Sequence, residues 1–249
     1  MNARPGCPAL ARRLLRCSVV LACVTAPAVA HAGSGAAPRG PRSVTIAMDV
    51  SGSMTPHRRA MEEWIVRQTI LGARSGDRYR VLKIGRRSFG DALVLPVLDL
   101  PATGRLLPDR RALYERLSAW SANARAVLPT VPREDATDVG GAVFQCARLL
   151  AGDGERFGER YMVLMTDLRD NRRLALPEDA AALRGVHVLV AFAAHDDGDP
   201  VAFARRVDAW RRFFVEHGAA SVRVLDVAEC SSGESWWLAQ SEPQRGRNR

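Results

Sequence analysis

The strongest constraint on the fold is the alternation of short apolar segments with longer amphipathic ones along most of the 249-residue chain. Short apolar segments rich in β-branched residues are typical of strands buried in a parallel sheet. Longer segments with apolar residues every three or four positions are typical of helices that cover such a sheet. The predicted strands are 44–50, 79–84, 93–100, 161–165, 186–192 and 221–227; the predicted helices are 56–71, 109–124, one that begins near 137, 177–184 and 200–216.

This alternation predicts the α/β fold class, with a single doubly wound, mostly parallel sheet that has helices on both faces. Pro96 lies inside the third predicted strand, and a proline cannot donate a hydrogen bond to a neighbouring strand. We therefore expect that strand at an edge of the sheet. The sequence shows no internal repeat.

The first residues have the features of a secretory signal peptide. Four arginines precede an apolar run from Cys17 to Ala30, and Ala30-His31-Ala32 matches a cleavage site for signal peptidase. The run is too short for an ordinary membrane span. We expect residues 1–32 to direct export to the periplasm or the medium. Val20-Leu21-Ala22-Cys23 offers an alternative, because a lipobox there would leave a lipid anchor on Cys23.

The rest of the chain divides by composition into three parts. Residues 33–42 are rich in Gly, Ala and Pro and are expected to form a flexible linker. Residues 43–228 contain the predicted strands and helices in one domain, and residues 229–249 form a C-terminal tail. Cys146 and Cys230 are the two cysteines beyond the signal, and an exported protein could join them in a disulfide. Their spacing does not decide whether it forms.

The basic residues argue against a nucleic-acid partner. Removal of the signal lowers the formal charge from +9 to +5, because 36 basic residues minus 4 leaves 32 against 27 acidic ones. Almost all of these residues are arginines, and they are scattered through every predicted element. Nucleic-acid sites usually gather them in one patch or stripe.

Oxygen-bearing side chains gather where predicted strands end. Asp49, Ser51 and Ser53 alternate after strand 44–50, and Gly52 between them lets the backbone bend. One carboxylate and two hydroxyls suit a hard divalent cation. Thr55-Pro56 follows as a predicted helix N-cap and first helical residue, so this stretch alone is equally consistent with a capped turn that binds no ion.

Two further segments make the ion site the better interpretation. The loops after parallel strands meet at one edge of a doubly wound sheet. Thr137 opens a predicted helix at that edge, and Thr166 and Asp167 follow the apolar strand 161–165. Together with Asp49, Ser51 and Ser53, these residues predict a cluster of carboxylates and hydroxyls.

In these segments the sequence resembles the von Willebrand factor A (VWA) domain family, many members of which carry a metal-ion-dependent adhesion site (MIDAS). The resemblance spans about residues 44–227 and rests on three motifs: Asp49-Val50-Ser51-Gly52-Ser53-Met54, Thr137-Asp138-Val139-Gly140-Gly141-Ala142 and Val163-Leu164-Met165-Thr166-Asp167. It implies a Rossmann-like VWA fold and a module that binds a partner without catalysis. Together with the signal-like residues 1–32, this predicts an exported, bacterial-type protein.

The resemblance also implies a metal site. Ser51, Ser53 and Thr137 would bind Mg²⁺ or Mn²⁺ through their hydroxyls, and Asp49 and Asp167 would balance its charge. A Glu or Asp carboxylate of a protein partner would complete the coordination.

The chain departs from the family pattern directly after the last motif. The family usually has glycine after the aspartate, whereas this chain continues with Leu168-Arg169-Asp170. Arg169 could screen an approaching acidic ligand or help to bind it, and Asp170 adds negative charge. The departure bears on the type of partner more than on the binding of the metal.

A metal-assisted hydrolase at the same sheet edge is the alternative function. A phosphatase of the haloacid-dehalogenase type needs a second acid two residues after Asp49, where this chain has Ser51. The G-x-S-x-G motif of α/β-hydrolases lacks its first glycine here. The histidines show no zinc-binding spacing, and His187 lies within a strand, where a hydrogen-bonded core position is expected. The sequence therefore offers no catalytic residue.

Overall fold

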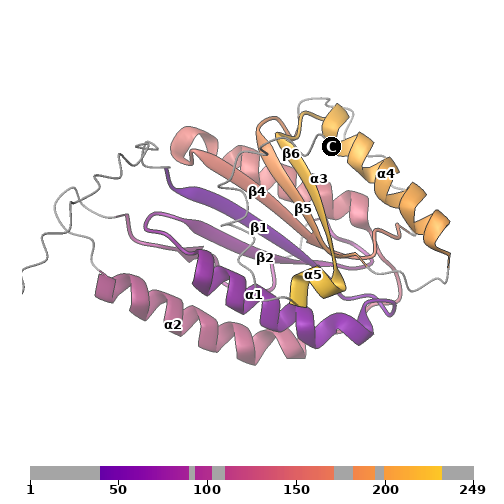
Figure 1. Ribbon diagram of the computed structural model, residues 1–249. Coiled ribbons are helices and arrows are strands. Elements are labelled where there is room, and N and C mark those ends of the chain that lie inside the picture. The colour runs from indigo at the N-terminus through magenta and orange to yellow at the C-terminus, as the bar shows by residue number, and fades with distance from the viewer. Residues whose placement is uncertain (1–39, 90–92, 103–109, 171–181, 194–198, 232–249) are drawn as a thin grey trace, which may run out of the picture. The chain divides into compact units, whose positions relative to one another are not determined.

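The computed structural model describes residues 40–89, 93–102, 110–170, 182–193 and 199–231, which form a six-stranded sheet of order β3-β2-β1-β4-β5-β6 (Figure 1). All neighbouring strands run parallel except β3, which pairs antiparallel with β2 at the edge. The strands are β1 (Arg42–Asp49), β2 (Arg78–Ile84), β3 (Leu98–Asp99), β4 (Glu159–Met165), β5 (Val186–Ala193) and β6 (Ser221–Asp226).

The strand order reverses beside β1. The chain places β2 and β3 on one side of β1 and then returns to place β4, β5 and β6 on the other side. The boundary between β1 and β4 is therefore the topological switch point of the sheet. Open α/β sheets bind their ligands outside the carboxyl ends of the strands at such a point.

Helices cover both faces of the sheet. Figure 1 shows α1 and α2 on one face and α3 and α4 on the other, with the short α5 beside α1. This arrangement confirms the predicted doubly wound α/β fold class. The helices are α1 (Arg58–Gly72), α2 (Arg110–Val127), α3 (Val139–Gly152), α4 (Pro200–Glu216) and α5 (Val227–Ser231), with 3₁₀ turns η1 (Thr55–His57), η2 (Leu128–Thr130) and η3 (Gly154–Arg156). No helix in the described part of the chain is long and apolar enough to cross a bilayer.

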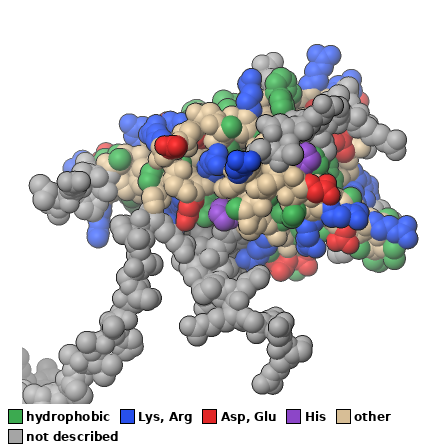
Figure 2. Space-filling model, turned by 90° about the horizontal axis from the view of Figure 1, so that it is seen from above, with side chains coloured by type: hydrophobic (Ala, Val, Ile, Leu, Met, Phe, Trp, Pro, Cys, Tyr) green, Lys and Arg blue, Asp and Glu red, His purple; other side chains and the backbone are tan. Residues whose placement is uncertain are grey.

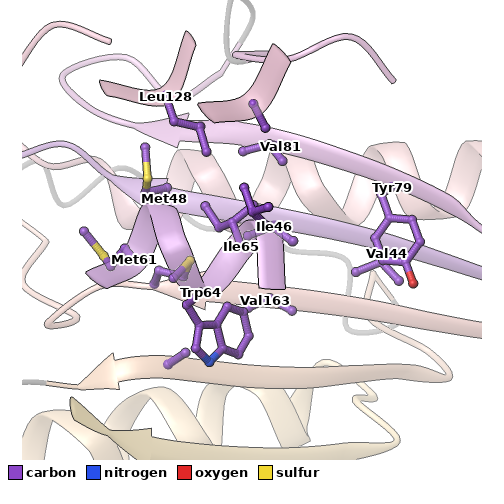
Figure 3. Packing of buried hydrophobic residues seen from close by; sticks show 14 of the residues in the cluster. Val44, Ile46, Met48, Met61, Trp64, Ile65, Tyr79, Val81, Leu128 and Val163 are labelled. Carbon is purple, nitrogen blue, oxygen red and sulfur yellow. The ribbon is translucent and has the colours of Figure 1, made fainter. Parts of the chain in front are cut away.

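The sheet separates two apolar layers, since alternate residues of a strand point to opposite faces. Val44, Ile46 and Met48 of β1 pack with α1, whereas Ala47 faces the layer beneath α3 and α4. Figure 3 shows the first layer, in which β1, β2 and β4 meet the face of α1 that carries Met61, Trp64 and Ile65. Burial of each large apolar side chain contributes about 1.5–3 kcal/mol. This packing fixes β1 in the centre of the sheet.

A buried ion pair lies near the amino end of β1. The guanidinium of Arg42 and the carboxylate of Asp77 are 2.5 Å apart, and both side chains are almost fully excluded from solvent. Asp77 also accepts hydrogen bonds from the backbone N–H groups of Arg42 and Arg74 at 2.8 and 2.9 Å. The sequence placed Arg42 at the end of the linker, whereas in the structure it is the first residue of β1. The pair connects this end of the sheet to the turn after α1.

Three local predictions differ from the structure. The predicted strand 93–100 contains a two-residue strand, β3, because Pro96 interrupts the pairing and Leu93 makes only an isolated bridge to Leu82. Most of the predicted helix 177–184 lies outside the described residues, and its described end is a turn. His187 is half-buried rather than in the core; its Nδ1 lies 2.9 Å from the Ser221 hydroxyl.

The two cysteines of the domain are both free and buried, so the possible disulfide does not form. Cys146 belongs to the apolar layer under α3, and Cys230 belongs to the layer under α1. The sheet lies between these layers. Two thiols on opposite faces of a sheet cannot reach the separation that a disulfide requires.

Candidate functional site

The loop after β1 is a tight turn held by its own side chains. The backbone N–H of Ser51 donates to the Asp49 carboxylate at 2.8 Å, and the N–H of Met54 donates to the Ser51 carbonyl at 3.3 Å. The hydroxyls of Ser51 and Ser53 lie 3.1 Å apart. Gly52 has open space where a side chain would lie, and its φ is not positive, so glycine is not needed for this bend.

The prediction that Thr55 caps the following helix is wrong. Met54 and His57 occupy the capping positions of η1 and α1, and neither side chain makes a capping hydrogen bond. The loop enters α1 through the 3₁₀ turn instead, because Pro56 fixes the backbone at the start of that turn. The hydroxyls of this loop are therefore not used as helix caps at this point.

Asp49 and the end of β4 meet at the switch point. Met48 pairs with Met165 in the parallel register, so the next residues along each strand, Asp49 and Thr166, lie side by side. The Thr166 hydroxyl donates to Asp49 Oδ2 at 2.7 Å and accepts from the backbone N–H of Leu168 at 3.1 Å. The bond from Thr166 to Asp49 joins the loops after β1 and β4, which the sequence predicted at the same edge of the sheet.

Asp49 is fully buried, and its environment disfavours the charged form. Burial raises the pKa of its carboxyl group from 3.8 to about 6, against the opposing effect of hydrogen bonds from Ser51 and Thr166. The nearby charge of Asp167 raises this pKa further. Burial of two neighbouring carboxylates costs free energy unless a cation compensates them. Asp49 is therefore a buried acid whose charged form is disfavoured by its surroundings.

Asp167 is also buried, and one of its oxygens has no hydrogen-bond donor. Its Oδ1 accepts from the backbone N–H of Arg169 at 2.9 Å. Its Oδ2 is inaccessible to solvent and accepts no hydrogen bond from the residues that the structure describes. A buried carboxylate oxygen normally accepts a hydrogen bond, so this oxygen is an exception.

The chain turns sharply after Asp167. Leu168 has φ +63°, a left-handed conformation that costs a side-chain-bearing residue about 1 kcal/mol or more. Glycine adopts this conformation without that cost. Two side chains of α4 hold the turn, because Arg206 Nε donates to the Asp167 carbonyl at 3.0 Å and Trp210 Nε1 donates to the Leu168 carbonyl at 3.2 Å.

Thr137 lies just before α3 and is almost fully buried. Backbone hydrogen bonds fix the chain on both sides of it: the N–H of Glu134 donates to the Val50 carbonyl at 3.1 Å, and the N–H of Asp138 donates to the Gly85 carbonyl at 2.9 Å. These acceptors directly follow β1 and β2. Thr137 is therefore held at the same carboxyl edge of the sheet as Asp49.

Asp138, rather than Thr137, caps the helix. Its carboxylate accepts from the N–H of Gly141 at 2.8 Å. The helix therefore begins just after Thr137, and the Thr137 hydroxyl is not used for the helix end. Asp170 Oδ2 accepts from the N–H of Gly140 at 3.1 Å, which ties the loop after β4 to the start of α3.

The donor set fits a hard divalent cation. Mg²⁺ binds oxygens in an octahedron at about 2.0–2.1 Å, so neighbouring ligands lie about 2.9 Å apart. The separation of 3.1 Å between the Ser51 and Ser53 hydroxyls is close to this value. Within the described residues, no three His, Cys, Asp or Glu side chains form a metal cluster. A site here would have to combine two carboxylates with hydroxyls.

One anchoring residue was not anticipated from the sequence. Glu134 makes an ion pair with Lys83, the single lysine of the chain, at 2.6 Å. It also forms a parallel bridge with Ser51. Glu134 therefore fixes the loop before Thr137 against the ends of β1 and β2. Nothing in the local sequence distinguishes it, because its partners Ser51 and Lys83 lie 83 and 51 residues before it in the chain.

The surface over these residues is shallow. The depression lined by Asp49, Ser51, Thr55, Arg58 and Arg133 encloses no volume for a small organic molecule. Figure 2 shows Lys and Arg side chains spread over one face in several groups, with other residue types between them.

No protein-family model matches the sequence, and no curated protein is similar to it. Several solved structures are similar in fold. A von Willebrand factor type A protein from Catenulispora acidiphila is 21% identical with a TM-score of 0.41, over 61% of this chain and 33% of that one, so this chain spans about a third of its length.

Two other similar structures extend this comparison. An aerotolerance-related membrane protein from Bacteroides fragilis is 15% identical with a TM-score of 0.44, over 77% of this chain and 94% of that one. Proximal thread matrix protein 1 of the mussel byssus was solved with a zinc-occupied MIDAS motif. It is 15% identical with a TM-score of 0.44, over 76% of this chain and 42% of that one. At these values the similarity concerns the course of the chain alone.

Proposed function

We propose that this protein is a VWA-type binding module that holds Mg²⁺ or Mn²⁺ at the carboxyl edge of its sheet. The hydroxyls of Ser51, Ser53 and Thr137 would hold the ion, and Asp49 and Asp167 would balance its charge. The observation that carries the proposal is the meeting of two buried carboxylates at the switch point, one of which has an oxygen without a donor. When bound, the ion supplies an exchangeable coordination position for an anionic oxygen.

The partner is proposed to be a protein that offers a Glu or Asp carboxylate. The shallow surface over Asp49 and Ser51 supports a macromolecular ligand, because a side chain that projects from a partner can reach an ion there. The same surface supports a role in binding rather than catalysis, since it does not enclose a small substrate. Export to the periplasm or medium remains part of the proposal and rests on the signal-like residues 1–32.

Metal-dependent thermal stabilisation tests the proposal. We expect the melting temperature of the purified protein to rise with Mg²⁺ or Mn²⁺ and to return with EDTA, because a ligand that binds only the folded state stabilises it. Ser53→Ala removes one half-buried hydroxyl and should reduce the rise, and Asp49→Ala should abolish it. Asp208→Ala removes an exposed carboxylate of α4 and serves as the matched control. An absence of stabilisation by both ions in the parent protein would exclude the metal site.

Capture of a partner tests the second half of the proposal. The protein is immobilised and exposed to an extracellular fraction with Mg²⁺ or with EDTA. We expect a partner that is retained only with the metal and that is lost with Asp49→Ala. Retention that is equal in EDTA would show that recognition does not use the ion.

A further inference from the structure

We propose that Arg169 is a built-in counter-ion for Asp167, which competes with the divalent cation for this carboxylate. Its Nε lies 3.6 Å from Asp167 Oδ2, within ion-pair distance but beyond a hydrogen bond. This is the same oxygen that is buried without a donor. A positive charge thus lies beside the oxygen that the cation requires, without donating a hydrogen bond to it. The inference rests on the proposed metal site.

The turn after Asp167 brings the two residues together. Because Leu168 takes the left-handed conformation, the chain reverses, and Arg169 approaches both carboxylate oxygens of Asp167. Its backbone N–H donates to Oδ1 at 2.9 Å, and its side chain lies beside Oδ2. A residue at this position therefore faces Asp167 because of the backbone conformation.

The backbone of this turn is fixed, whereas the Arg169 side chain has access to solvent. The side chains of Arg206 and Trp210 hold the carbonyls of Asp167 and Leu168 from α4. The Arg169 side chain is 35% exposed, and that of Asp167 is 2% exposed. The guanidinium can therefore withdraw from Oδ2 without a change in the turn or in the position of the carboxylate.

This arrangement predicts opposite effects of Arg169 with and without metal. Without metal, its charge offsets part of the cost of burying Asp167 beside Asp49. With metal, the same charge repels the cation and must withdraw from the oxygen. Replacement of Arg169 by a neutral residue should therefore weaken the metal-free protein and tighten the binding of metal. A side chain that only supports the fold would not have both effects.

Titration with Mn²⁺, followed by the electron paramagnetic resonance of the free ion, measures the second effect. We expect Arg169→Gln to bind Mn²⁺ at least about fivefold more tightly than the parent, because a repulsive charge near a divalent ion is removed. Arg169→Lys keeps the charge and should remain close to the parent. Arg59→Gln, an exposed arginine of α1 that pairs with Glu63, controls for the change in net charge. Equal or weaker binding by Arg169→Gln would overturn the inference.

Thermal unfolding in EDTA measures the first effect and does not depend on metal. We expect Arg169→Gln to melt below the parent and Arg169→Lys to restore most of the loss. An unchanged melting temperature for Arg169→Gln would refute the counter-ion role. If the parent binds no Mn²⁺ but the variants differ in EDTA as expected, the proposed metal function fails while the counter-ion role holds.

Discussion

Asp49→Asn should stabilise the metal-free protein at neutral pH, although it alters the centre of the proposed site. The substitution keeps the shape of a fully buried side chain and removes its charge. An amide oxygen can still accept the hydrogen bond from the Ser51 backbone N–H, which is 2.8 Å long in the parent. The Thr166 hydroxyl, which donates to the second carboxylate oxygen at 2.7 Å in the parent, would face the amide NH₂ group instead. The variant therefore loses the buried negative charge and one hydrogen bond.

The magnitude follows from the pKa of this carboxyl group, which burial raises from 3.8 to about 6. A raised carboxyl pKa means that the folded state holds the proton more tightly than the unfolded state does. The charge of Asp49 therefore lowers the stability of the parent above about pH 6, and this cost disappears as the pH falls towards 4. The difference between the two pKa values corresponds to about 3 kcal/mol at pH 7 to 8 and about half of that at pH 5.

Urea unfolding of both proteins in EDTA, between pH 5 and pH 8, checks this expectation. At pH 8 the loss of the Thr166 hydrogen bond offsets about 1 kcal/mol of this gain. The variant should therefore be more stable by about 2 kcal/mol, which corresponds to about 4–8 °C in melting temperature for a domain of this size. The advantage should shrink as the pH falls. Asp208→Asn, at an exposed position, should show no comparable difference.

Two results would refute this reasoning. A variant that is less stable than the parent at pH 8 would show that the carboxylate is compensated in the metal-free protein. A difference that does not change with pH would show that the effect comes from packing rather than from charge. Saturating Mg²⁺ should remove or reverse the advantage of the variant, because only the parent would gain stability from the ion.

Two further substitutions test the positions that hold the sheet and the helix beside the site. Asp77→Ala leaves the buried guanidinium of Arg42 without its carboxylate and should lower the free energy of unfolding in urea by about 3–5 kcal/mol. The addition of Arg42→Met to this variant should recover much of the lost stability. A loss below about 1 kcal/mol for Asp77→Ala would contradict the pairing. Gly141→Ala places a methyl group against the Asp138 carboxylate that caps α3 and should cost about 1–2 kcal/mol by the same measurement. Gly152→Ala, which has open space at the other end of α3, should be neutral or stabilising.

The periodic features of the sequence were sufficient to predict the fold class. The centre of every predicted apolar segment except 93–100 is a strand, and α4 covers the predicted residues 200–216. Period and composition determine such elements because burial on one or two faces decides which residues are tolerated there. The failures lie where local signals compete. Thr55 and Thr137 both have the chemistry of a helix cap, yet neither caps a helix.

The candidate site was predicted as a set of residues, and it stays a prediction as a metal site. The sequence indicated Asp49 and Asp167 because both lie where apolar strands end, and parallel strands bring such positions to one edge. It could not indicate how the two meet. The register between β1 and β4 sets Thr166 beside Asp49, and only pairing between strands more than a hundred residues apart fixes that register.

By itself, the sequence determined the alternation of strands and helices and the chemistry of the side chains at the loop ends. The tertiary structure decided which charges are compensated. It buried Asp77 with Arg42, and it left one oxygen of Asp167 without a hydrogen bond beside Arg169. The physical reason is that the free energy of a charge depends on its distance from other charges and from water. Those distances arise from packing between distant segments, which no local pattern records.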